Sequence, residues 1–363
     1  MLRQETIKKW IKGSVIEKVY FYLEWNDNEL LPIKQASWSH KIPINIKWKK
    51  VIKIGYREII LCSSFTPKKE LKVNENLKDY NSFLISHLQK AVRRNKINAS
   101  LYTADLLLET EPIKLLRRLP IIMIEDTQIH HSYSTLVWLM CLVSSKFSLN
   151  KNHKRWVLGV VYLLSISKYK EDFDYNDKWF FYKKIKLIHS IKNNLLQDII
   201  YSLETRKCYG GLKGDKIMIE SFQNIYLNRY LHNDIDSKFE SFFYKKVKPI
   251  MTKKVKFKQT DWLLEAYDFH INKSLPWILE SEFPEYNTDE YKKAIWYRSS
   301  GINFRNVIKF NKKFIYCGKN IIPKQITEIW NKIKTYVRRK SWGFIQRMLE
   351  DLHSVYPEWI DFT

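Results

Sequence analysis

The first part of the chain alternates apolar and polar residues. Two groups of apolar residues stand at every second position: Val19, Phe21, Leu23 and Trp25, then Ile42, Ile44, Ile46 and Trp48. A period of two places one face of a strand in a core and the other in water. The pattern therefore predicts β-strands from about residue 15 to about residue 65, including one strand over residues 41–48.

From residue 81 the apolar spacing becomes that of a helix. The first stripe consists of Phe83, Leu84, Leu88, Ala91 and Val92. Lys90, Arg93 and Arg94 close its last turn, where cations suit the helix dipole. Further helices are expected over 98–110, 112–124, 134–147 and 153–167, with more helix through residue 230.

One stretch, 127–145, carries no formal charge, but only 135–143 is densely apolar. A membrane span needs about 20 predominantly apolar residues. We therefore expect a buried core helix here and no membrane partner. A second apolar run over 156–166 leaves a two-helix membrane hairpin as the less favoured alternative.

Near the C-terminus, six apolar and aromatic residues repeat at helical spacing after Pro323: Ile326, Ile329, Trp330, Ile333, Tyr336 and Val337. Most of the neighbouring cations fall elsewhere around the helical wheel: Lys332, Lys334, Arg338, Arg339 and Lys340. The spacing predicts an amphipathic helix with a basic side.

Together these patterns predict an α+β protein that is predominantly α-helical. We expect a small β-rich N-terminal domain over 1–78, a central helical domain over 79–235, and a basic, mainly helical C-terminal region over 236–363. The polar, lysine-containing stretch 66–80 marks the first boundary. No tandem repeat of 20–50 residues is present.

Composition places the chain among folded proteins. Of its 363 residues, 45% are hydrophobic and 15% aromatic, which excludes a largely disordered or low-complexity protein. Four widely spaced cysteines exclude a disulfide scaffold and offer no close pair for zinc. The charged N-terminus lacks the apolar core of a signal peptide. We therefore expect an intracellular location, in the nucleus or cytoplasm of a host cell if the chain is viral.

Basic charge is the strongest functional feature. The chain has 63 Lys and Arg against 38 Asp and Glu, and residues 305–347 hold twelve cations and one acid. Such clustering, with aromatic residues between the cations, indicates a surface for a polyanion. There are three alternatives: an acidic protein partner, a membrane surface, or ordinary solvated charge in a sequence that is rich in Lys, Ile and Asn. The candidate nucleic-acid-binding residues are Lys245, Lys246, Lys248, Lys253, Lys254, Lys332, Lys334, Arg338, Arg339 and Lys340.

One glycine-rich element contains Gly210, Gly211, Lys213 and Gly214. Such a loop lets backbone amides approach a phosphate, so these residues form a candidate phosphate loop. The alternative, which we favour, is a helix-to-helix connection in which Asp215 caps the second helix. Neither a GxxxxGK[ST] nor a GxGxxG motif is present, which argues against a P-loop ATPase.

Two groups of ionisable residues could support chemistry. The candidate cluster is Asp126, His130, His131, Asp268 and His270, since carboxylates and imidazoles bind divalent metals or transfer protons. Structural roles are the favoured alternative, so we expect no metal and no cofactor. A nuclease site that combined Asp268 with Glu290 and Lys292 would need a strand, whereas residues 288–290 predict the start of a helix.

Residues 87–131 resemble part of the C-terminal helical region of the RarA/MgsA family of replication-associated recombination ATPases. The resemblance rests on three groups of residues: the run 89–94, the leucine-rich run 99–109, and Arg117, Arg118 and Leu119 followed by Glu125 and Asp126. It covers about an eighth of the chain and implies a helical module of the kind that supports oligomerisation and work at replication forks. The family's ATPase module has no counterpart, because residues 1–80 contain no Walker motif. In composition the chain also resembles proteins of large AT-rich DNA viruses.

The leading hypothesis is a non-catalytic nucleic-acid-binding factor that acts in replication, repair, recombination or packaging, with DNA favoured over RNA. A metal-dependent nucleic-acid-processing enzyme and a structural or assembly protein that binds an acidic partner are the alternatives. Whether the chain forms a homo-oligomer stays open at this point.

Overall fold

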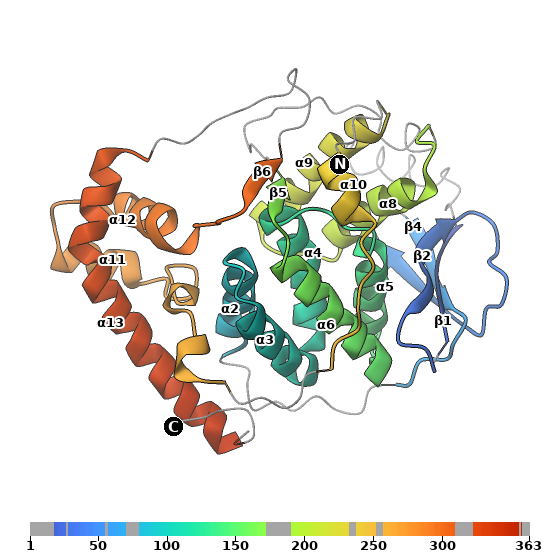
Figure 1. The fold of residues 1–363 in the computed structure, drawn as a ribbon, viewed down its shortest axis with the longest axis horizontal. Helices are drawn as coiled ribbons and strands as arrows, with labels where there is room; N and C mark the ends of the chain where they lie inside the picture. The colour runs from blue at the N-terminus through green and yellow to red at the C-terminus, as the bar shows by residue number, and fades with distance from the viewer. Residues whose placement is uncertain are drawn as a thin grey trace, which may run out of the picture.

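The computed structural model describes residues 18–26, 28–54, 57–69, 80–171, 190–231, 237–251, 257–308, 322–355 and 357. The fold is α+β and predominantly helical, as the sequence predicts: a small four-stranded sheet precedes the helical part (Figure 1). The sheet lies at one end of the molecule, and the longest helix, α13 (Lys324–Val355), lies at the opposite end (Figure 1).

The sheet consists of β1 (Lys18–Trp25), β2 (Pro32–Ser39), β3 (Trp48–Ile54) and β4 (Arg57–Ser63) in the order β2-β1-β4-β3. Strand β1 pairs antiparallel with β2 and parallel with β4, and β3 pairs antiparallel with β4. The alternation in β1 is confirmed, since Val19, Phe21, Leu23 and Trp25 are all buried. A strand with one buried and one less buried face covers a core on one side only.

The predicted strand over 41–48 is wrong. Residues 41–47 connect β2 to β3, and β3 begins only at Trp48. Ile42 and Ile44 are 72% and 83% exposed, and Asn45 has a φ of 66°. A left-handed residue and the missing N–H of Pro43 both interrupt a ladder, so the alternating sequence finds no partner strand.

Five helices form the centre of the molecule: α2 (Asn81–Arg93), α3 (Ile97–Thr110), α4 (Pro112–Asp126), α5 (Tyr133–Ser144) and α6 (Lys151–Ser165). They confirm the predicted helices with small shifts at the ends. Pro112 stands in the first turn of α4, and the Asn150 side chain caps α6 by accepting from the backbone N–H of His153 at 2.8 Å.

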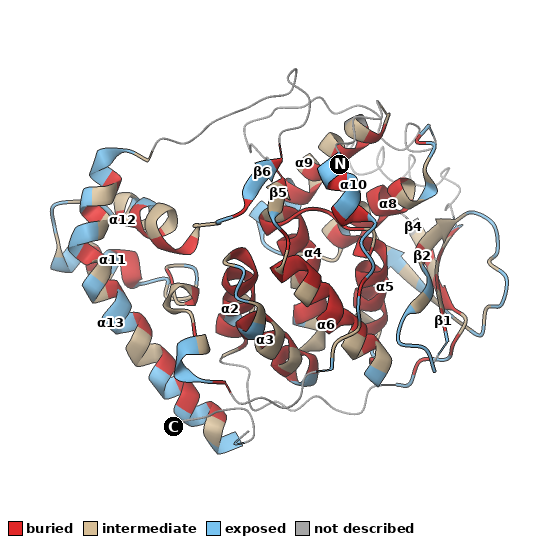
Figure 2. Cartoon of the chain, in the orientation of Figure 1, coloured by how far each residue is buried: buried red, intermediate tan, exposed pale blue. Residues whose placement is uncertain are grey.

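Helix α5 is the uncharged run expected to be a core helix, and that prediction is confirmed. Every residue from Tyr133 to Val143 is buried. Figure 2 shows α5 beside α4 and α6 in the most buried part of the molecule. Among the described residues, no helix has the length and apolar character needed to cross a bilayer.

The remaining chain adds helices around this centre. They are α8 (Asn194–Cys208), α9 (Lys213–Leu231), α10 (Ser237–Phe243), α11 (Leu275–Glu282), α12 (Thr288–Ile295) and α13, with short helical turns η2 (Gln259–Asp261), η3 (Leu264–Ala266) and η4 (Trp296–Ser300). Two short strands, β5 (Tyr169–Glu171) and β6 (Asn306–Ile308), pair in parallel. Through this pairing, the segment that precedes α13 in the chain is attached to the segment that follows α6.

Two hydrophobic cores organise these elements. The larger core extends from the sheet through α2–α10 to the C-terminal half of α13. The sheet joins it directly: the Trp138 side chain of α5 donates to the carbonyl of Phe21 at 3.0 Å, and Phe21 stacks on Trp38. The smaller core lies between α11, α12 and the N-terminal half of α13. The two predicted boundaries between the three domains stay predictions.

The described cysteines are free thiols, in agreement with the widely spaced sequence positions. Cys62 and Cys141 are buried and Cys208 is exposed. Burial raises the pKa of Cys62 and of Cys141 to about 12. Neither buried thiol is therefore a nucleophile near neutral pH, because the thiolate is the reactive form.

The chain after α10 crosses α6 at a glycine. A Cβ on Gly159 would lie 2.3 Å from the carbonyl oxygen of Lys248 and 2.9 Å from a methyl carbon of Val247. This contact lets Val247 pack while the backbone N–H of Ile250 donates to the carbonyl of Arg155 at 3.0 Å. Only a glycine leaves room for the crossing.

We expect Gly159→Ala to lower the free energy of unfolding by about 1–3 kcal/mol, because overpacking outweighs the better helix propensity of alanine. Gly343→Ala in α13 is the matched control, since its Cβ would meet only the Arg347 side chain at 3.9 Å. The control should gain up to about 1 kcal/mol. Urea unfolding measures the stability of both variants. Equal stability would contradict the close contact between Gly159 and the segment at Lys248.

Candidate nucleic-acid interface

Helix α13 carries the basic cluster on which the functional hypothesis depends. Its apolar stripe is buried: Ile326, Ile329, Ile333 and Val337 in the smaller core, then Ile345, Met348, Leu349 and Leu352 in the larger core. One helix is thereby held at two places, which is visible as the buried side of α13 in Figure 2. Its exposed side has a fixed position relative to the rest of the molecule.

Three consecutive cations lie on the exposed side of α13. Arg338, Arg339 and Lys340 are all exposed. The Arg339 guanidinium lies 5.6 Å and the Lys340 ammonium 5.4 Å from the ring centre of Tyr336. Within the described ranges, none of the three forms an ion pair. No carboxylate of the described residues therefore offsets their charges.

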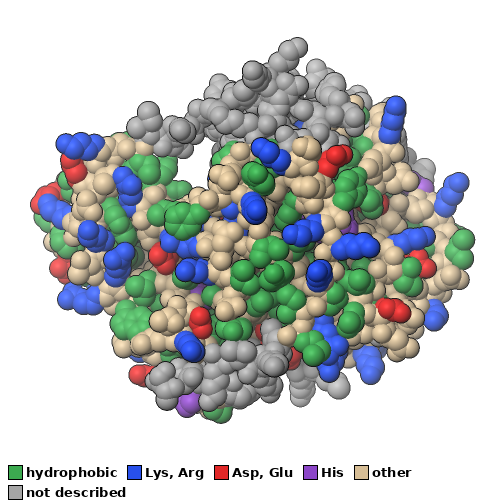
Figure 3. Space-filling model, in the orientation of Figure 1, with side chains coloured by type: hydrophobic (Ala, Val, Ile, Leu, Met, Phe, Trp, Pro, Cys, Tyr) green, Lys and Arg blue, Asp and Glu red, His purple; other side chains and the backbone are tan. Residues whose placement is uncertain are grey.

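Two other predicted cations on α13 have partners inside the protein. Lys332 forms an ion pair with Glu285, and the Lys334 ammonium donates to the side chain of Asn331 at 3.2 Å. Figure 3 shows the lobe formed by α11–α13, in which Lys and Arg side chains stand among a few acidic ones. Lys334 keeps its charge, since Asn331 is neutral, and Arg347 has no ion pair among the described residues. Residues 338–340 are the longest run of such cations on this helix.

The arginine cluster continues toward the body of the protein. Arg338 lines a cavity of about 170 Å³ between α13, η3 and η4, together with Arg94 and Arg298. The Arg94 side chain pairs with Glu265 at 3.4 Å and donates to the carbonyl of Ser299 at 2.6 Å. Three guanidinium groups therefore line the junction between the smaller core and α2.

The second predicted group of lysines lies on the segment that crosses α6. Lys245, Lys246 and Lys248 are exposed, whereas Val247 between them is buried. The carbonyl oxygen of Lys245 accepts from the His130 ring nitrogen Nε2 at 2.7 Å. Lys253 and Lys254 lie outside the described residues. The three described lysines are held at fixed backbone positions and point their charges to solvent.

The glycine-rich element connects α8 to α9, as the favoured alternative expects. The expected cap is wrong, because α9 begins at Lys213 and Asp215 therefore lies inside the helix. Gly210 and Gly211 have φ values of 81° and 132°, which only glycine adopts without strain. Lys213 and Gly214 begin α9 and are exposed. Helix α9 starts three residues before Lys216, and Asp215 lies in its first turn, 3.4 Å from Arg118.

Asp126 takes part in a buried ion-pair network at the end of α4. Its carboxylate lies 2.5 Å from Nε of Arg93, and Glu125 lies 3.0 Å from Nη2 of the same guanidinium. The Gln89 side chain donates to both carboxylates, at 2.8 and 2.9 Å. Burial lowers the pKa of Arg93, but Asp126 and Glu125 outweigh this effect and raise the pKa above its ordinary value.

Asp268 forms a second buried ion pair, with Lys90 of the same helix α2. Its carboxylate lies 3.2 Å from the Lys90 ammonium and 3.1 Å from Nδ1 of His270. Burial raises the pKa of Asp268, but the bonds from His270 and the charge of Lys90 outweigh burial and lower the pKa below its usual range. The carboxylate is thus ionised and committed to a cation inside the protein.

His130 and His131 lie apart from these ion pairs and contact α10 and the segment after it. The imidazole of His130 bonds to the carbonyl of Lys245, and the backbone N–H of His131 donates to the carbonyl of Phe243 at 3.3 Å. Burial lowers the pKa of His130 to about 3. Among the described residues, no three His, Cys, Asp or Glu side chains are grouped as a metal site requires.

Sequence reasoning missed the buried cations that organise this region. Lys90 and Arg93 were expected in the last turn of a helix, where cations suit its dipole, and no burial was predicted for them. They are 6% and 2% exposed. Arg305 is also buried, and its guanidinium donates to the carbonyls of Val92, Arg93, Leu164 and Ser167 at the ends of α2 and α6. The available signal was the acidic pair at residues 125 and 126 directly after an apolar helix, since buried carboxylates require cations.

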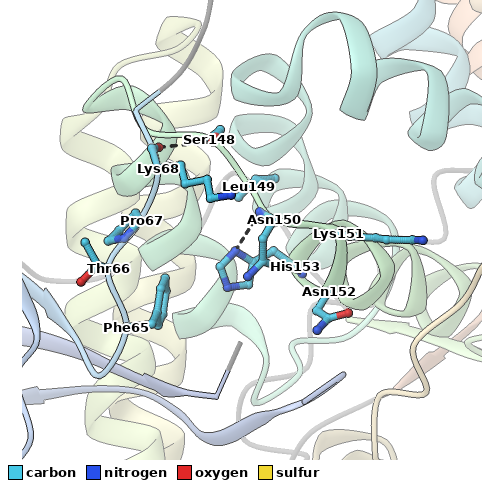
Figure 4. A pocket seen from close by; sticks show the side chains of 10 residues that line it. All are labelled: Phe65, Thr66, Pro67, Lys68, Ser148, Leu149, Asn150, Lys151, Asn152 and His153. Atoms are coloured by element: carbon cyan, nitrogen blue, oxygen red, sulfur yellow. Dashed lines mark hydrogen bonds between the residues drawn. The ribbon is translucent and has the colours of Figure 1, made fainter. Parts of the chain in front are cut away.

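A cavity of about 570 Å³ lies at the start of α6, between residues 65–68 and 148–153. Figure 4 shows the side chains that line it. The backbone N–H of Asn150 bonds to Nδ1 of His153 at 3.4 Å. The imidazole also faces the rings of Trp25 and Phe65. Burial lowers the pKa of His153 to about 3, so this histidine is neutral and serves to begin the helix.

Comparison with known proteins leaves the function to be argued from this geometry. No family model, curated protein or solved structure matches the chain. Four of the residues that carry the resemblance to the RarA/MgsA family meet, because Gln89 and Arg93 of α2 contact Glu125 and Asp126 of α4. That resemblance stays a prediction from sequence.

Proposed function

We propose that this chain is a non-catalytic nucleic-acid-binding factor that acts in replication, repair, recombination or packaging. DNA is the favoured partner. The observation that carries the proposal is the run Arg338, Arg339 and Lys340, which is exposed and has no ion pair within the described ranges. Cations that the protein does not itself neutralise are those that release counterions when they meet phosphates.

The position of the three cations supports a phosphate contact. They stand on a helix of 32 residues that is packed in two cores, so their backbone does not have to be ordered on binding. Preorganised groups lose less entropy on association than groups on a mobile loop. Tyr336, beside Arg339 and Lys340, adds an aromatic face on which a base or a guanidinium can stack.

The exposed lysines of the segment across α6 support the same function. Lys245, Lys246 and Lys248 form a second group of exposed cations on the segment across α6, where the backbone is held against His130 and Gly159. Contacts of this kind position a protein on the phosphate backbone and carry no base sequence information. We therefore propose binding that depends weakly on sequence and strongly on salt.

The enzyme alternative lacks a comparable observation in the described part of the chain. Asp126 and Asp268 each pair with a buried cation. Glu290 and Lys292 lie on helix α12, where the Glu290 carboxylate accepts from the backbone N–H of Asn287 at 2.9 Å. These carboxylates are used to hold helices in place, whereas metal-dependent chemistry needs them to converge on one ion.

The test is the triple variant Arg338→Gln, Arg339→Gln, Lys340→Gln. Glutamine keeps the length and much of the helix propensity, so α13 should stay folded. We expect weaker binding to duplex DNA and a shallower dependence of log K on log salt, by up to about 0.9 for each lost phosphate contact. Fluorescence anisotropy of a labelled duplex over about 50–200 mM salt measures the slope.

A matched control removes the same charge from the opposite end of the molecule. Lys47, Lys49 and Lys53 are exposed on or beside β3, and their replacement by Gln should leave the salt slope unchanged. If both triple variants lose slope equally, the binding comes from overall charge and not from α13. An unchanged slope in a folded α13 variant would remove the proposal's main support.

A further inference from the structure

A second set of cations surrounds a cavity on a different side of the helical body. The cavity is wide open to solvent, has a volume of about 330 Å³, and lies between α2, α4, the end of α8 and the loop before α9. Its charged lining consists of Lys114, Arg117, Arg118, Arg206 and Asp215. None of these cations belongs to the basic cluster of α13 or to the segment across α6.

In the described part of the chain, the cations around this cavity outnumber the carboxylates near them. Asp215 is shared, since it lies 3.4 Å from Arg118 and also close enough to act on Arg206. Lys114 pairs with Glu111 at 3.3 Å. The described residues offer no ion pair to Arg117 or Arg206. The four cations therefore face Asp215 and Glu111, and Arg118 is also close enough to act on Glu125 in the network of α2.

Arg206 is the fixed element of the cavity. It is 2% exposed, and its guanidinium donates to the carbonyls of Arg117 at 2.8 Å and Gly210 at 2.7 Å. Burial lowers the pKa of Arg206, and the charges of Arg117 and Arg118 add to this effect. The arrangement thus holds guanidinium groups together although they repel each other, and an anion bound among them would relieve the repulsion.

The glycine-rich loop forms one wall through its backbone. A Cβ on Gly211 would lie 3.4 Å from the Asp215 carboxylate and 3.8 Å from Nη1 of Arg206. A Cβ on Gly210 would lie 3.5 Å from Nη2 of Arg117. The two left-handed glycines therefore bring the chain against the arginines. Lys213 is exposed and lies outside the lining of the cavity.

We propose that this cavity binds the phosphate group of a small phosphorylated molecule, with Arg117, Arg118 and Arg206 as its contacts. Guanidinium groups match the geometry of phosphate oxygens and bind them in a bidentate manner. The volume is at the lower end of the range of about 300–1,000 Å³ for small-molecule sites, which suits a pyrophosphate or a nucleotide. This site is separate from the proposed interface on α13.

Isothermal titration calorimetry with inorganic pyrophosphate, ATP and adenosine at constant ionic strength tests the site. We expect pyrophosphate and ATP to bind and adenosine not to bind. Tighter binding of ATP than of pyrophosphate identifies a nucleotide, and equal binding identifies the phosphates alone as the ligand. Absence of heat from both phosphorylated compounds would overturn the proposal.

Two variants locate the binding. Arg117→Gln removes a guanidinium that makes no described hydrogen bond, so the fold should survive, and we expect a dissociation constant for pyrophosphate about 10–100 times larger. Lys213→Gln removes one charge from the neighbouring helix start and should change the constant less than about twofold. Loss of affinity in the Lys213 variant instead of the Arg117 variant would contradict the assignment.

The two proposals can fail separately. The triple variant of residues 338–340 should bind pyrophosphate as the unchanged protein does, and Arg117→Gln should keep the salt slope of DNA binding. If Arg117→Gln loses DNA binding as well, the cavity is part of the nucleic-acid interface and is not a separate small-molecule site.

Discussion

Replacement of Arg93 by Met is expected to lower the free energy of unfolding by about 3–5 kcal/mol, which is a large part of the stability of an ordinary domain. The guanidinium is 2% exposed and bonds to Asp126, Glu125 and the carbonyl of Ser300. Without it, a carboxylate that is itself 2% exposed loses its countercharge. Breaking a buried pair costs more than the pair contributes, because the remaining charge stays out of water.

A double-mutant cycle isolates this charge. Asp126→Asn should destabilise the protein as well, but the combination of Arg93→Met with Asp126→Asn should cost clearly less than the sum of the two. Arg339→Met, on the exposed side of α13, is the control and should stay within about 0.5 kcal/mol of the unchanged protein. Urea unfolding measures all four. Additive losses in the cycle would mean that the two side chains act independently.

Acid should unfold the protein between about pH 6.5 and pH 4, because three buried histidines must take up protons. Burial lowers the pKa of His87 to about 4, and lowers the pKa of His130 and His153 to about 3. In the unfolded chain the same groups have a pKa of about 6.5. The unfolded state therefore binds more protons in this range, so stability is present above pH 6.5 and is lost as pH falls.

The size of the effect follows from the shifts. At about 1.4 kcal/mol per pKa unit, each histidine contributes on the order of 3–5 kcal/mol at neutral pH. Asp198 acts in the opposite direction, because burial raises its pKa to about 7. As pH falls, its protonation removes a buried negative charge and stabilises the folded state. Glu125 acts in the same direction as Asp198, because burial and the charge of Asp126 raise its pKa. Three imidazoles oppose these two carboxyl groups, and the sum still favours unfolding in acid.

Circular dichroism during acid titration tests this prediction. His87→Gln should move the transition to lower pH if the variant folds, because one group that must be protonated is gone. His40 is exposed, and His40→Gln should leave the midpoint unchanged. A protein that keeps its fold at pH 4 would show that these imidazoles reach water or a proton acceptor before global unfolding.

Local patterns predicted most of the elements. Strand β1 and helices α2–α6 follow from a period of two or of 3.6 residues, and the ends of these helices lie within three residues of the expected positions. Each of these features depends on neighbours within one or two turns, so the sequence contains its cause. The start of α12 at residues 288–290 was also expected. The side chain that caps this helix belongs to Asn287.

Where the pattern failed, the missing information was a partner. Residues 41–48 alternate as well as β1 does, yet no neighbouring strand or core covers Ile42 and Ile44. Alternation predicts a strand only if a second strand supplies its hydrogen bonds. The same limit applied to the candidate site residues. The sequence showed which residues are ionisable, but it did not show which cation pairs with Asp126 or with Asp268.

The sequence by itself determined the fold class, the basic character of the C-terminal region and the exposed run at 338–340, because these depend on composition and on helical spacing. Tertiary structure decided which charges are neutralised. Lys90 and Arg93 became buried ion-pair partners, Lys332 met Glu285, and Arg206 joined Arg117 and Arg118 from a distant part of the chain. These contacts join residues up to about 180 positions apart, and Coulomb energy depends on separation in space, which no local spacing encodes.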